Sequence, residues 1–369
     1  MGASEAAYRP GPVAIALALF AGLFAPGVGR ALQAAEPPSA PLLESAAIAI
    51  ATESDPEASA RKIRRALSRL EKKAKRRIRG AENTQERRGL FDRFFFTEAG
   101  FRGSTALDTR RPEDGRSESG AGLLLHEVLE TRSGTCVGLA QIYLILSDRL
   151  ELPVVGAATP AHLFVRWLNG GARINTELLE QGAEHPDADY RTRYRIDEAD
   201  PSDPVFLRDL TTDEVAARIY NNRGVLRSHA GHLEAASADY ARAIDLDVKF
   251  PAPYYNRGLD QLNSGQLKEA LSSLDAALTL HPGDAWALNN RGLVHLKLGR
   301  LEQAEEDFRL AVAIEPGLAA ARKNLSLVSS RIDRGDRVGG DKTATEGTAS
   351  SSGTTPARDP AGETAGPRP

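Results

Sequence analysis

The tripeptide Asn-Arg-Gly stands at residues 222–224, 256–258 and 290–292, so it recurs at a constant spacing of 34 residues. Other positions that recur in the same phase are Gly231, Gly265 and Gly299, then Ala236, Ala270 and Ala304, then Tyr240, Leu274 and Phe308. Self-similarity at such a period predicts helical hairpins, in which glycine ends one helix and small residues let two helices approach closely. One hairpin cannot bury its apolar face alone, whereas three stacked hairpins can.

This pattern resembles the tetratricopeptide repeat family over about 100 residues. The resemblance implies an all-α solenoid at residues 213–332, made of three repeats and a capping helix that begins near Leu318. In this family the first helices line a groove that holds a protein or peptide. The residues that often face such a groove are here Asn222, Asn256 and Asn290. Hydrogen bonding to a peptide is one interpretation of these asparagines; a solvated helix face or a bond between repeats is the other.

An export signal is predicted for residues 1–35. Arg9 supplies a positive flank, Val13–Ala25 is an apolar run too short to span a bilayer comfortably, and small residues follow. The signal predicts an exported protein, either periplasmic or secreted, with no stable membrane span after cleavage. We expect the source to be bacterial. An uncleaved N-terminal anchor is the alternative.

The composition of the chain limits its domain organisation and the kinds of partner that it can bind. With 369 residues, of which 41% are hydrophobic and 26% charged, the chain is long enough for two domains with separate cores. A net charge of −3 gives no nucleic-acid signature, so we expect no nucleic-acid partner. Residues 36–45 would be a linker and residues 46–212 a second domain. Residues 333–369, rich in Gly, Ser, Thr, Pro and Ala, would be a disordered tail.

A basic segment opens this second domain. Arg61–Arg79 is dense in lysine and arginine and carries apolar residues at helical spacing, which predicts an amphipathic helix with Asp55 as its N-cap. One interpretation of its basic face is binding to an anionic surface. A solvated face is favoured, because charge runs on helices usually serve solubility. The aromatic stretch Leu90–Phe101 would build the core, and residues 103–120 would form a long loop.

The single cysteine, Cys136, begins a predicted buried helix with Leu139, Ile142 and Leu146 on one face. Free amides and the positive end of the helix dipole favour a thiolate there and can hold an oxyanion. The alternative is a small core residue. No histidine has the spacing of a paired metal ligand with this cysteine, and no glycine-rich phosphate loop is evident. We therefore expect no metal and no cofactor.

The next segments predict a β-hairpin. Ala161–Trp167 and Ala172–Leu178 read as strands around the turn signal Asn169-Gly170. Along the first strand, His162 shares a face with every second residue. With a two-residue turn it would lie opposite Glu177, and Asn175 would be its diagonal neighbour. A base and its polar partner would thus share one sheet surface, as a Cys-His-Asn or Cys-His-Asp site requires.

Three phrases carry a second resemblance. They read Leu-His-Glu-Val-Leu at residues 125–129, Arg-Ser-Gly-Thr-Cys at 132–136 and Pro-Ala-His-Leu-Phe-Val-Arg at 160–166. These phrases resemble the transglutaminase-like superfamily, and more narrowly its SirB-type branch, which often carries tetratricopeptide repeats. The resemblance implies an α+β domain of papain/transglutaminase-like fold.

The same resemblance implies a catalytic triad. Cys136 matches the nucleophile, His162 the base and Asn175 the third member, where many relatives carry aspartate. Glu177 is the second candidate for the third position, because it shares the sheet face. Asparagine orients an imidazole as a neutral acceptor in papain-like enzymes.

Two functions follow. The first is a cysteine-dependent hydrolase or transferase of amides, such as a peptidase or acyltransferase, whose repeats bind a protein partner or substrate. The second is a non-catalytic adaptor, in which the repeats carry the function and the triad is vestigial.

Overall fold

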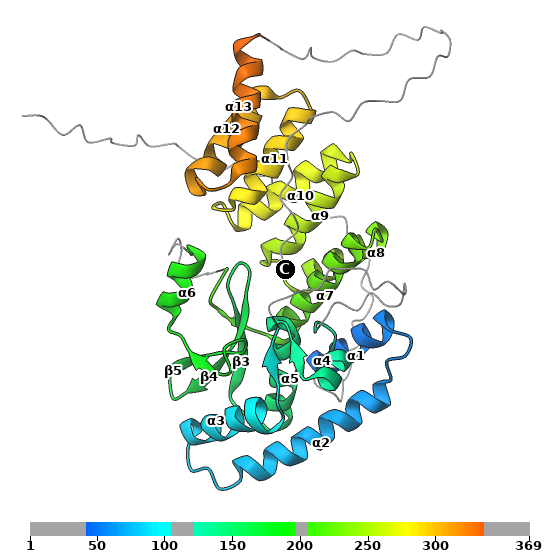
Figure 1. Cartoon of the computed structure of the whole chain (residues 1–369), viewed down its shortest axis with the longest axis vertical. Coiled ribbons are helices and arrows are strands. Elements are labelled where there is room, and N and C mark those ends of the chain that lie inside the picture. The colour runs from blue at the N-terminus through cyan, green and yellow to red at the C-terminus, as the bar shows by residue number, and fades with distance from the viewer. Residues whose placement is uncertain (1–41, 105–121, 197–204, 336–369) are drawn as a thin grey trace, which may run out of the picture. The chain divides into compact units, whose positions relative to one another are not determined.

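The computed structural model describes residues 42–104, 122–196 and 205–335. The predicted signal, nearly all of the predicted loop at 103–120 and the predicted tail beyond residue 335 lie outside the described residues. Figure 1 shows the described chain, with the mixed α/β part in blue to green and the helical repeats in green to orange.

Four short elements begin the first domain: α1 (Leu42–Ser54), α2 (Ala60–Ile78), α3 (Thr84–Asp92) and the π-helical turn η1 (Arg93–Glu98). The predicted basic helix is α2, and its apolar residues Ile63, Leu67, Leu70 and Ala74 are buried. Its N-cap is Ser59, which accepts from the Lys62 amide, and not Asp55 as predicted. Asp55 instead accepts from the Glu57 amide and binds His126.

A helix pair follows in the centre of the domain. Strand β1 (Arg102–Gly103) pairs in parallel with β2 (Ser133–Gly134), and α4 (Leu125–Thr131) lies between them in the chain. Helix α5 (Cys136–Arg149) then runs through the core with almost every residue buried. The predicted aromatic stretch packs against it. The ring centroids of Phe91 and Phe95 lie 4.9 Å and 5.0 Å from that of Tyr143.

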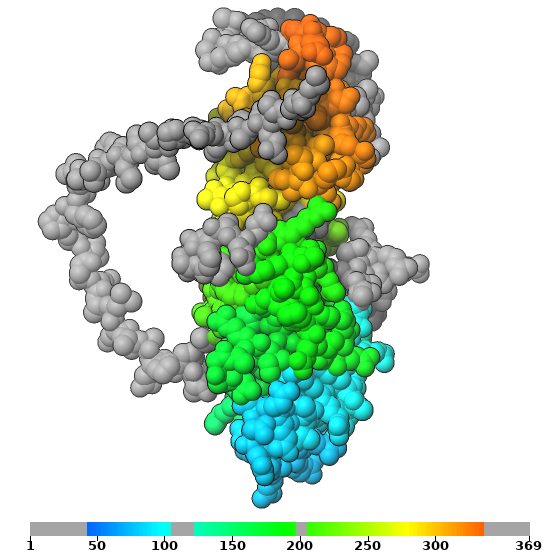
Figure 2. All heavy atoms as spheres, turned by 90° about the vertical axis from the view of Figure 1, so that its left-hand side faces the viewer, coloured from blue at the N-terminus to red at the C-terminus, as the bar shows by residue number. Residues whose placement is uncertain are grey.

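The sheet is antiparallel, with the strand order β6-β5-β4-β3-β7. Its strands are β3 (Val154–Ala158), β4 (Leu163–Asn169), β5 (Ala172–Glu177), β6 (Ala183–Glu184) and β7 (Asp209–Leu210), and α6 (Asp187–Tyr194) follows β6. Figure 2 shows the face on which the sheet region, in green, adjoins α3 and its neighbours, in cyan. Arg88 of α3 joins the two by donating to Thr176 and pairing with Glu184.

The hairpin of β4 and β5 turns one residue later than the sequence predicted. Asn169 pairs with Ala172, so the two turn residues are Gly170 and Gly171, both with positive φ, which glycine adopts without cost. Arg166 consequently lies opposite Asn175. His162 precedes β4 and lies in the turn between β3 and β4, where its carbonyl accepts from the Thr159 amide at 2.8 Å.

Seven helices form the repeats and their cap, as the period of 34 residues predicted. They are α7 (Thr212–His229), α8 (Leu233–Leu246), α9 (Pro251–Asn263), α10 (Leu267–Leu280), α11 (Ala285–Lys297), α12 (Leu301–Ile314) and α13 (Ala319–Asp333). A β-carbon added at Gly224 would meet Tyr240 at 2.6 Å, and one at Gly292 would meet Phe308 at 2.6 Å. The recurring glycines therefore permit each hairpin's close packing.

Helix α7 belongs to two packing layers. Val215, Ala216 and Ile219 join the core that surrounds α5, while Ala217 packs with Ala243 of α8 and Phe250. Arg223 of α7 also bonds Asp239 of α8 and pairs with Glu53 of α1. The first helix of the repeats is therefore also part of the first domain.

Candidate active site

Cys136 is the first residue of α5, as predicted, and is partly exposed. Thr135 caps the helix by accepting from the Gly138 amide at 3.1 Å, and its own amide donates to the Gly122 carbonyl at 2.9 Å. A β-carbon at Gly138 would lie 1.9 Å from the Gly122 oxygen. The glycine at position 138 thus lets the preceding loop cross the first turn of α5 and fix the position of Cys136.

His162 is held by Glu177. The Nε2 atom of the imidazole lies 2.6 Å from Oε2 of the carboxylate, and the two side chains are 8% and 1% exposed. Glu177 also accepts from the Leu179 amide at 3.1 Å and from the Tyr190 hydroxyl at 3.2 Å. Three donors therefore fix this buried carboxylate, which offsets the cost of removing its charge from water.

Asn175 does not reach His162, so the predicted third member is wrong in this geometry. Its Oδ1 accepts from Arg166 Nε at 2.7 Å, and its Nδ2 donates to the His185 carbonyl and to Asp187. The physical reason is the later turn, which pairs Asn175 directly with Arg166. Glu177, the second candidate from the sequence, takes the place beside the imidazole.

The electrostatics of the pair favour a charged imidazole. Burial by itself lowers the pKa of His162, but hydrogen bonds to Cys136 and Glu177 and their charges raise it to about 10. For Glu177, burial raises the pKa, yet the bond to His162 and its positive charge leave the pKa below the usual value of 4.5. Cys136 and Glu177 therefore both favour the charged form of the imidazole.

An aromatic layer covers the imidazole. The Tyr194 ring lies parallel to that of His162 with centroids 6.2 Å apart, and the Phe164 and Tyr190 rings stack at 4.1 Å beside it. Burial raises the pKa of the Tyr190 hydroxyl, which stays a donor to Glu177. Helix α6 therefore contributes two side chains that fix the histidine–glutamate pair.

A cavity of about 20 Å³ lies beside the cysteine. Cys136 and His162 line it from the first domain, and Arg218, Asn222 and Phe250 line it from the repeats. A space of this size holds a water molecule or a single small group. The first repeat is therefore one wall of the site.

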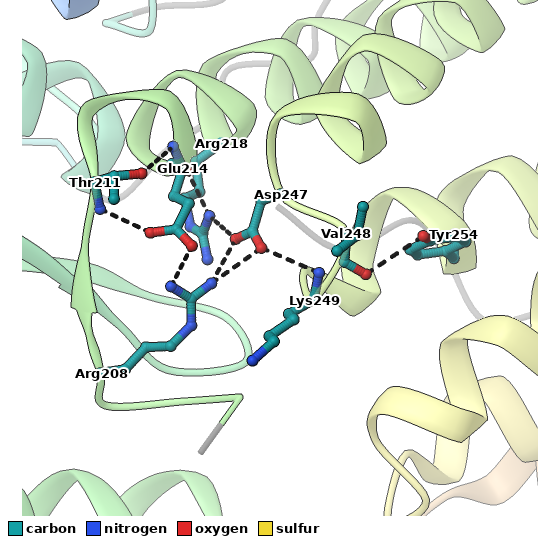
Figure 3. A network of polar contacts seen from close by, with 8 residues as sticks. All are labelled: Arg208, Thr211, Glu214, Arg218, Asp247, Val248, Lys249 and Tyr254. Carbon is teal, nitrogen blue, oxygen red and sulfur yellow. Dashed lines mark hydrogen bonds and ion pairs between the residues drawn. The ribbon is translucent and has the colours of Figure 1, made fainter. Parts of the chain in front are cut away.

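Arg218 is fixed in that wall by a buried network (Figure 3). Its Nη1 donates to Asp247 Oδ2 at 2.5 Å, and its guanidinium lies 4.2 Å from the centre of the Phe250 ring. Arg208 donates to both oxygens of Asp247 at 3.0 Å and also pairs with Glu214. Burial lowers the pKa of Arg218, while the charge of Asp247 opposes that shift.

The three asparagines of the repeats do not face an open groove. Asn256 and Asn290 are fully buried; Asn256 donates to Asn221 at 2.9 Å and Asn290 to the Tyr255 hydroxyl at 3.1 Å. Asn222 accepts from Asn221 at 3.1 Å and lines the cavity beside Cys136. The predicted groove-facing role is therefore wrong, and the alternative of bonds between repeats holds for Asn256 and Asn290.

Sequence reasoning missed Tyr190, Arg218, Asp247 and Phe250. Arginine and aspartate 29 residues apart leave no local pattern, so only the tertiary fold reveals their pairing. A weak signal did exist, because Arg218 is a charged residue on a helix face that otherwise carries Val215 and Ile219.

Among the described residues, no cluster of three or more histidines, cysteines or carboxylates has the arrangement of a metal site. No helix within the described ranges is both long and apolar enough to cross a bilayer.

Comparisons with known proteins place two families along the chain. Residues 61–221 match the model of the transglutaminase-like superfamily, and residues 217–248 and 255–319 match models of the tetratricopeptide repeat. The chain thus carries a transglutaminase-like domain followed by tetratricopeptide repeats, which confirms the predicted fold class. The two matches overlap at 217–221, within α7. No curated protein matches the chain.

Several solved tetratricopeptide repeat domains are similar to about a third of this chain. The Arabidopsis OM64 TPR domain is 22% identical, with 32% of this chain and 98% of that one covered and a TM-score of 0.31. The Sgt2 TPR domain from Aspergillus fumigatus is 18% identical, with 37% and 90% covered and a TM-score of 0.31. The second TPR domain of human RPAP3, in complex with an HSP70 peptide, is 26% identical, with 32% and 95% covered and a TM-score of 0.30.

Proposed function

We propose that the transglutaminase-like domain is a cysteine-dependent amide hydrolase or transferase with the triad Cys136, His162 and Glu177. The observation that carries the proposal is the bond of His162 to Glu177 at 2.6 Å, at a cavity that His162 lines together with Cys136. A nucleophile, a base and a group that orients the base are the parts that thiol catalysis requires. Glutamate in the third place also favours the charged imidazole more strongly than asparagine would.

The reaction follows from these positions. The Cys136 sulfur attacks the carbonyl carbon of an amide, and the proton of His162 moves to the amine nitrogen as the C–N bond breaks. A thioester remains on Cys136. Water in hydrolysis, or a second amine in transfer, then attacks the thioester while neutral His162 removes the attacking group's proton. The C–S bond breaks, which releases the acyl product and restores the Cys136 thiolate beside protonated His162. The Glu177 carboxylate keeps the imidazole oriented through both steps.

The first turn of α5 would stabilise the oxyanion that forms in each attack. The Gly138 amide already donates to Thr135 Oγ1, and the Leu139 amide donates to the Thr135 carbonyl. The amides of Cys136 and Val137 are the donors we assign to the oxyanion, because they lie at the free end of the helix where its dipole is positive.

Labelling with iodoacetamide at neutral pH, followed by intact-mass analysis, tests this proposal. We expect Cys136 to react much faster than a free cysteine and His162→Ala to slow the reaction. If Cys136 in the full chain reacted with iodoacetamide as slowly as free cysteine does, the enzyme proposal would be overturned.

A non-catalytic adaptor is the second candidate, and the narrowness of the site favours it. The cavity beside Cys136 has only about 20 Å³, and Phe250 and Arg218 of the repeats wall it on one side. In this reading the repeats bind a protein or peptide and the triad is vestigial. Partner recovery from native extract should then be the same for wild type and Cys136→Ser, whereas loss of the partner in the variant would contradict it.

Two narrower points also stay proposals. We propose that residues 1–35 direct export and are then removed, because Val13–Ala25 is an apolar run of signal length with Arg9 before it. N-terminal sequencing of the mature protein tests this point. We also propose the SirB-type branch for the domain, on the phrases at 125–129 and 160–166.

A further inference from the structure

An open hollow of about 500 Å³ lies on the first domain, formed by α2, η1 and the end of α4. Four cations line it: Lys73, Arg76 and Arg77 from α2, and Arg132 from the end of α4. The single carboxylate of its lining, Glu98, is already paired with Arg77. The wall therefore carries a large positive excess over a volume typical of small-molecule sites.

Arg132 differs from the other three cations in its backbone conformation. It ends α4 in the left-handed conformation, with φ of 59° and ψ of 18°, where glycine or asparagine would be usual. Its amide donates to the Val128 carbonyl, and its carbonyl accepts from the Arg102 amide at 2.9 Å. The backbone hydrogen bonds therefore hold Arg132 in a sparsely populated conformation at the edge of the hollow.

The Arg132 guanidinium is also short of hydrogen-bond partners. It lies over the Phe101 ring at 4.7 Å from its centre, and its Nη1 atom is buried with no partner among the described residues. Burial lowers the pKa of Arg132, and the nearby charge of Arg69 lowers it further. A buried donor without an acceptor is costly, and an acceptor that a ligand brought to this nitrogen would remove that cost.

The basic face of α2 extends this positive surface. The helix carries ten lysines and arginines in the sequence ARKIRRALSRLEKKAKRRI, with Glu71 as its only acid, and Glu71 pairs with Arg149. Arg149 also bonds Glu44, so the contact of Glu71 lies on the side of α2 that faces α1 and α5. The side with Lys73 and Arg76 keeps its charge.

We propose that this hollow binds a phosphate group, with Arg132, Lys73 and Arg76 as its ligands. Phosphate suits the site because three cations that line one hollow match a group of up to two negative charges and several acceptor oxygens better than a single carboxylate would. Leu70 and Phe94 also line the hollow and would contact an apolar part beside the phosphate. A soluble phosphate compound and an anionic lipid headgroup both offer this chemistry.

Calorimetric titration of the full chain with pyrophosphate tests the soluble source. Co-sedimentation with phosphatidylcholine vesicles, with and without phosphatidylglycerol, tests the lipid source. Saturable binding in either arm is expected. Lys73→Gln combined with Arg76→Gln should weaken it at least about tenfold, since hydrogen bonds to charged groups are lost.

The matched control is Arg61→Gln combined with Arg64→Gln, which removes the same charge from the exposed N-terminal half of α2, outside the hollow. It should weaken binding by no more than about twofold. Arg132→Gln should weaken it as strongly as the double variant, provided that its thermal unfolding matches wild type; otherwise the double variant decides. The proposal is overturned if neither probe binds, or if the control pair weakens binding as much as the Lys73 and Arg76 pair.

Discussion

The Nε2 atom of His162 lies 2.6 Å from Oε2 of Glu177, and this bond joins the turn before β4 to the last residue of β5. The imidazole therefore keeps one nitrogen on the glutamate and has the other for the cysteine. Burial of both side chains makes this pair the fixed part of the site, against which Cys136 is positioned by α5.

Removing the carboxylate of Glu177 should slow the reaction of Cys136 with iodoacetamide more than removing the side-chain amide of Asn175. We expect Glu177→Gln to lower the iodoacetamide rate of Cys136 at neutral pH by at least about tenfold, because the imidazole loses the charge that keeps it protonated. Asn175→Ala on the same strand should leave that rate within about twofold, since Asn175 contacts Arg166 and not His162. Equal effects of the two variants would restore Asn175 as a candidate third member.

The titration of His162 gives a second test with a defined sign. Because its pKa is raised from 6.5 to about 10, protonated His162 stabilises the fold fully below pH 6.5, and the contribution is lost as pH rises to about 10. Glu177 has a lowered pKa, so its contribution is present above pH 4.5 and lost on further acidification. The loss of unfolding free energy in Glu177→Gln should thus be largest between pH 4.5 and 6.5 and shrink toward pH 10. Chemical denaturation across this range measures it; a loss independent of pH would contradict the charged pair.

The sequence predicted the site residues better than their pairing. The stretch Asn169-Gly170-Gly171 contains two overlapping turn signals, and either dipeptide suits a two-residue hairpin. A shift of the turn by one residue keeps every side chain on its face but changes each partner by two positions, so Glu177 takes the diagonal place beside His162 that was predicted for Asn175. Both residues were on the correct face, and only the contact could distinguish them.

The repeats were predictable because their constraints are local and recur. Gly224, Gly258 and Gly292 each face the aromatic or leucine residue sixteen positions later, so one rule explains three contacts. By contrast, Asn256 bonds Asn221 across two repeats, and Arg218 of α7 meets Asp247 after α8. Contacts of this kind depend on how helices stack and leave no pattern in the surrounding residues.

The buried pair at the wall of the cavity predicts a large stability effect. Asp247→Asn should lower the free energy of unfolding by about 3–5 kcal/mol, because Arg208 and Arg218 would be left without their shared counter-charge. Asp245→Asn, two residues earlier and exposed, should change it by less than about 0.5 kcal/mol. Urea unfolding of the two variants provides the measurement, and similar small losses in both would show that the Asp247 network contributes little.

The close approach of the repeat helices gives the last prediction. Gly292→Ala places a β-carbon 2.6 Å from Phe308 Cε1. Because the Phe308 ring is fully buried, either the ring or the two helices must shift. We expect a loss of about 1–3 kcal/mol in the free energy of unfolding, as for other overpacked cores. Gly317→Ala is the matched control, because no heavy atom lies within 4 Å of its added β-carbon and its φ is not positive; its effect should stay within about 0.5 kcal/mol. Urea unfolding followed by the helical circular dichroism signal compares the two. If Gly292→Ala were as stable as wild type, glycine at this position would not be required for the packing of α11 against α12.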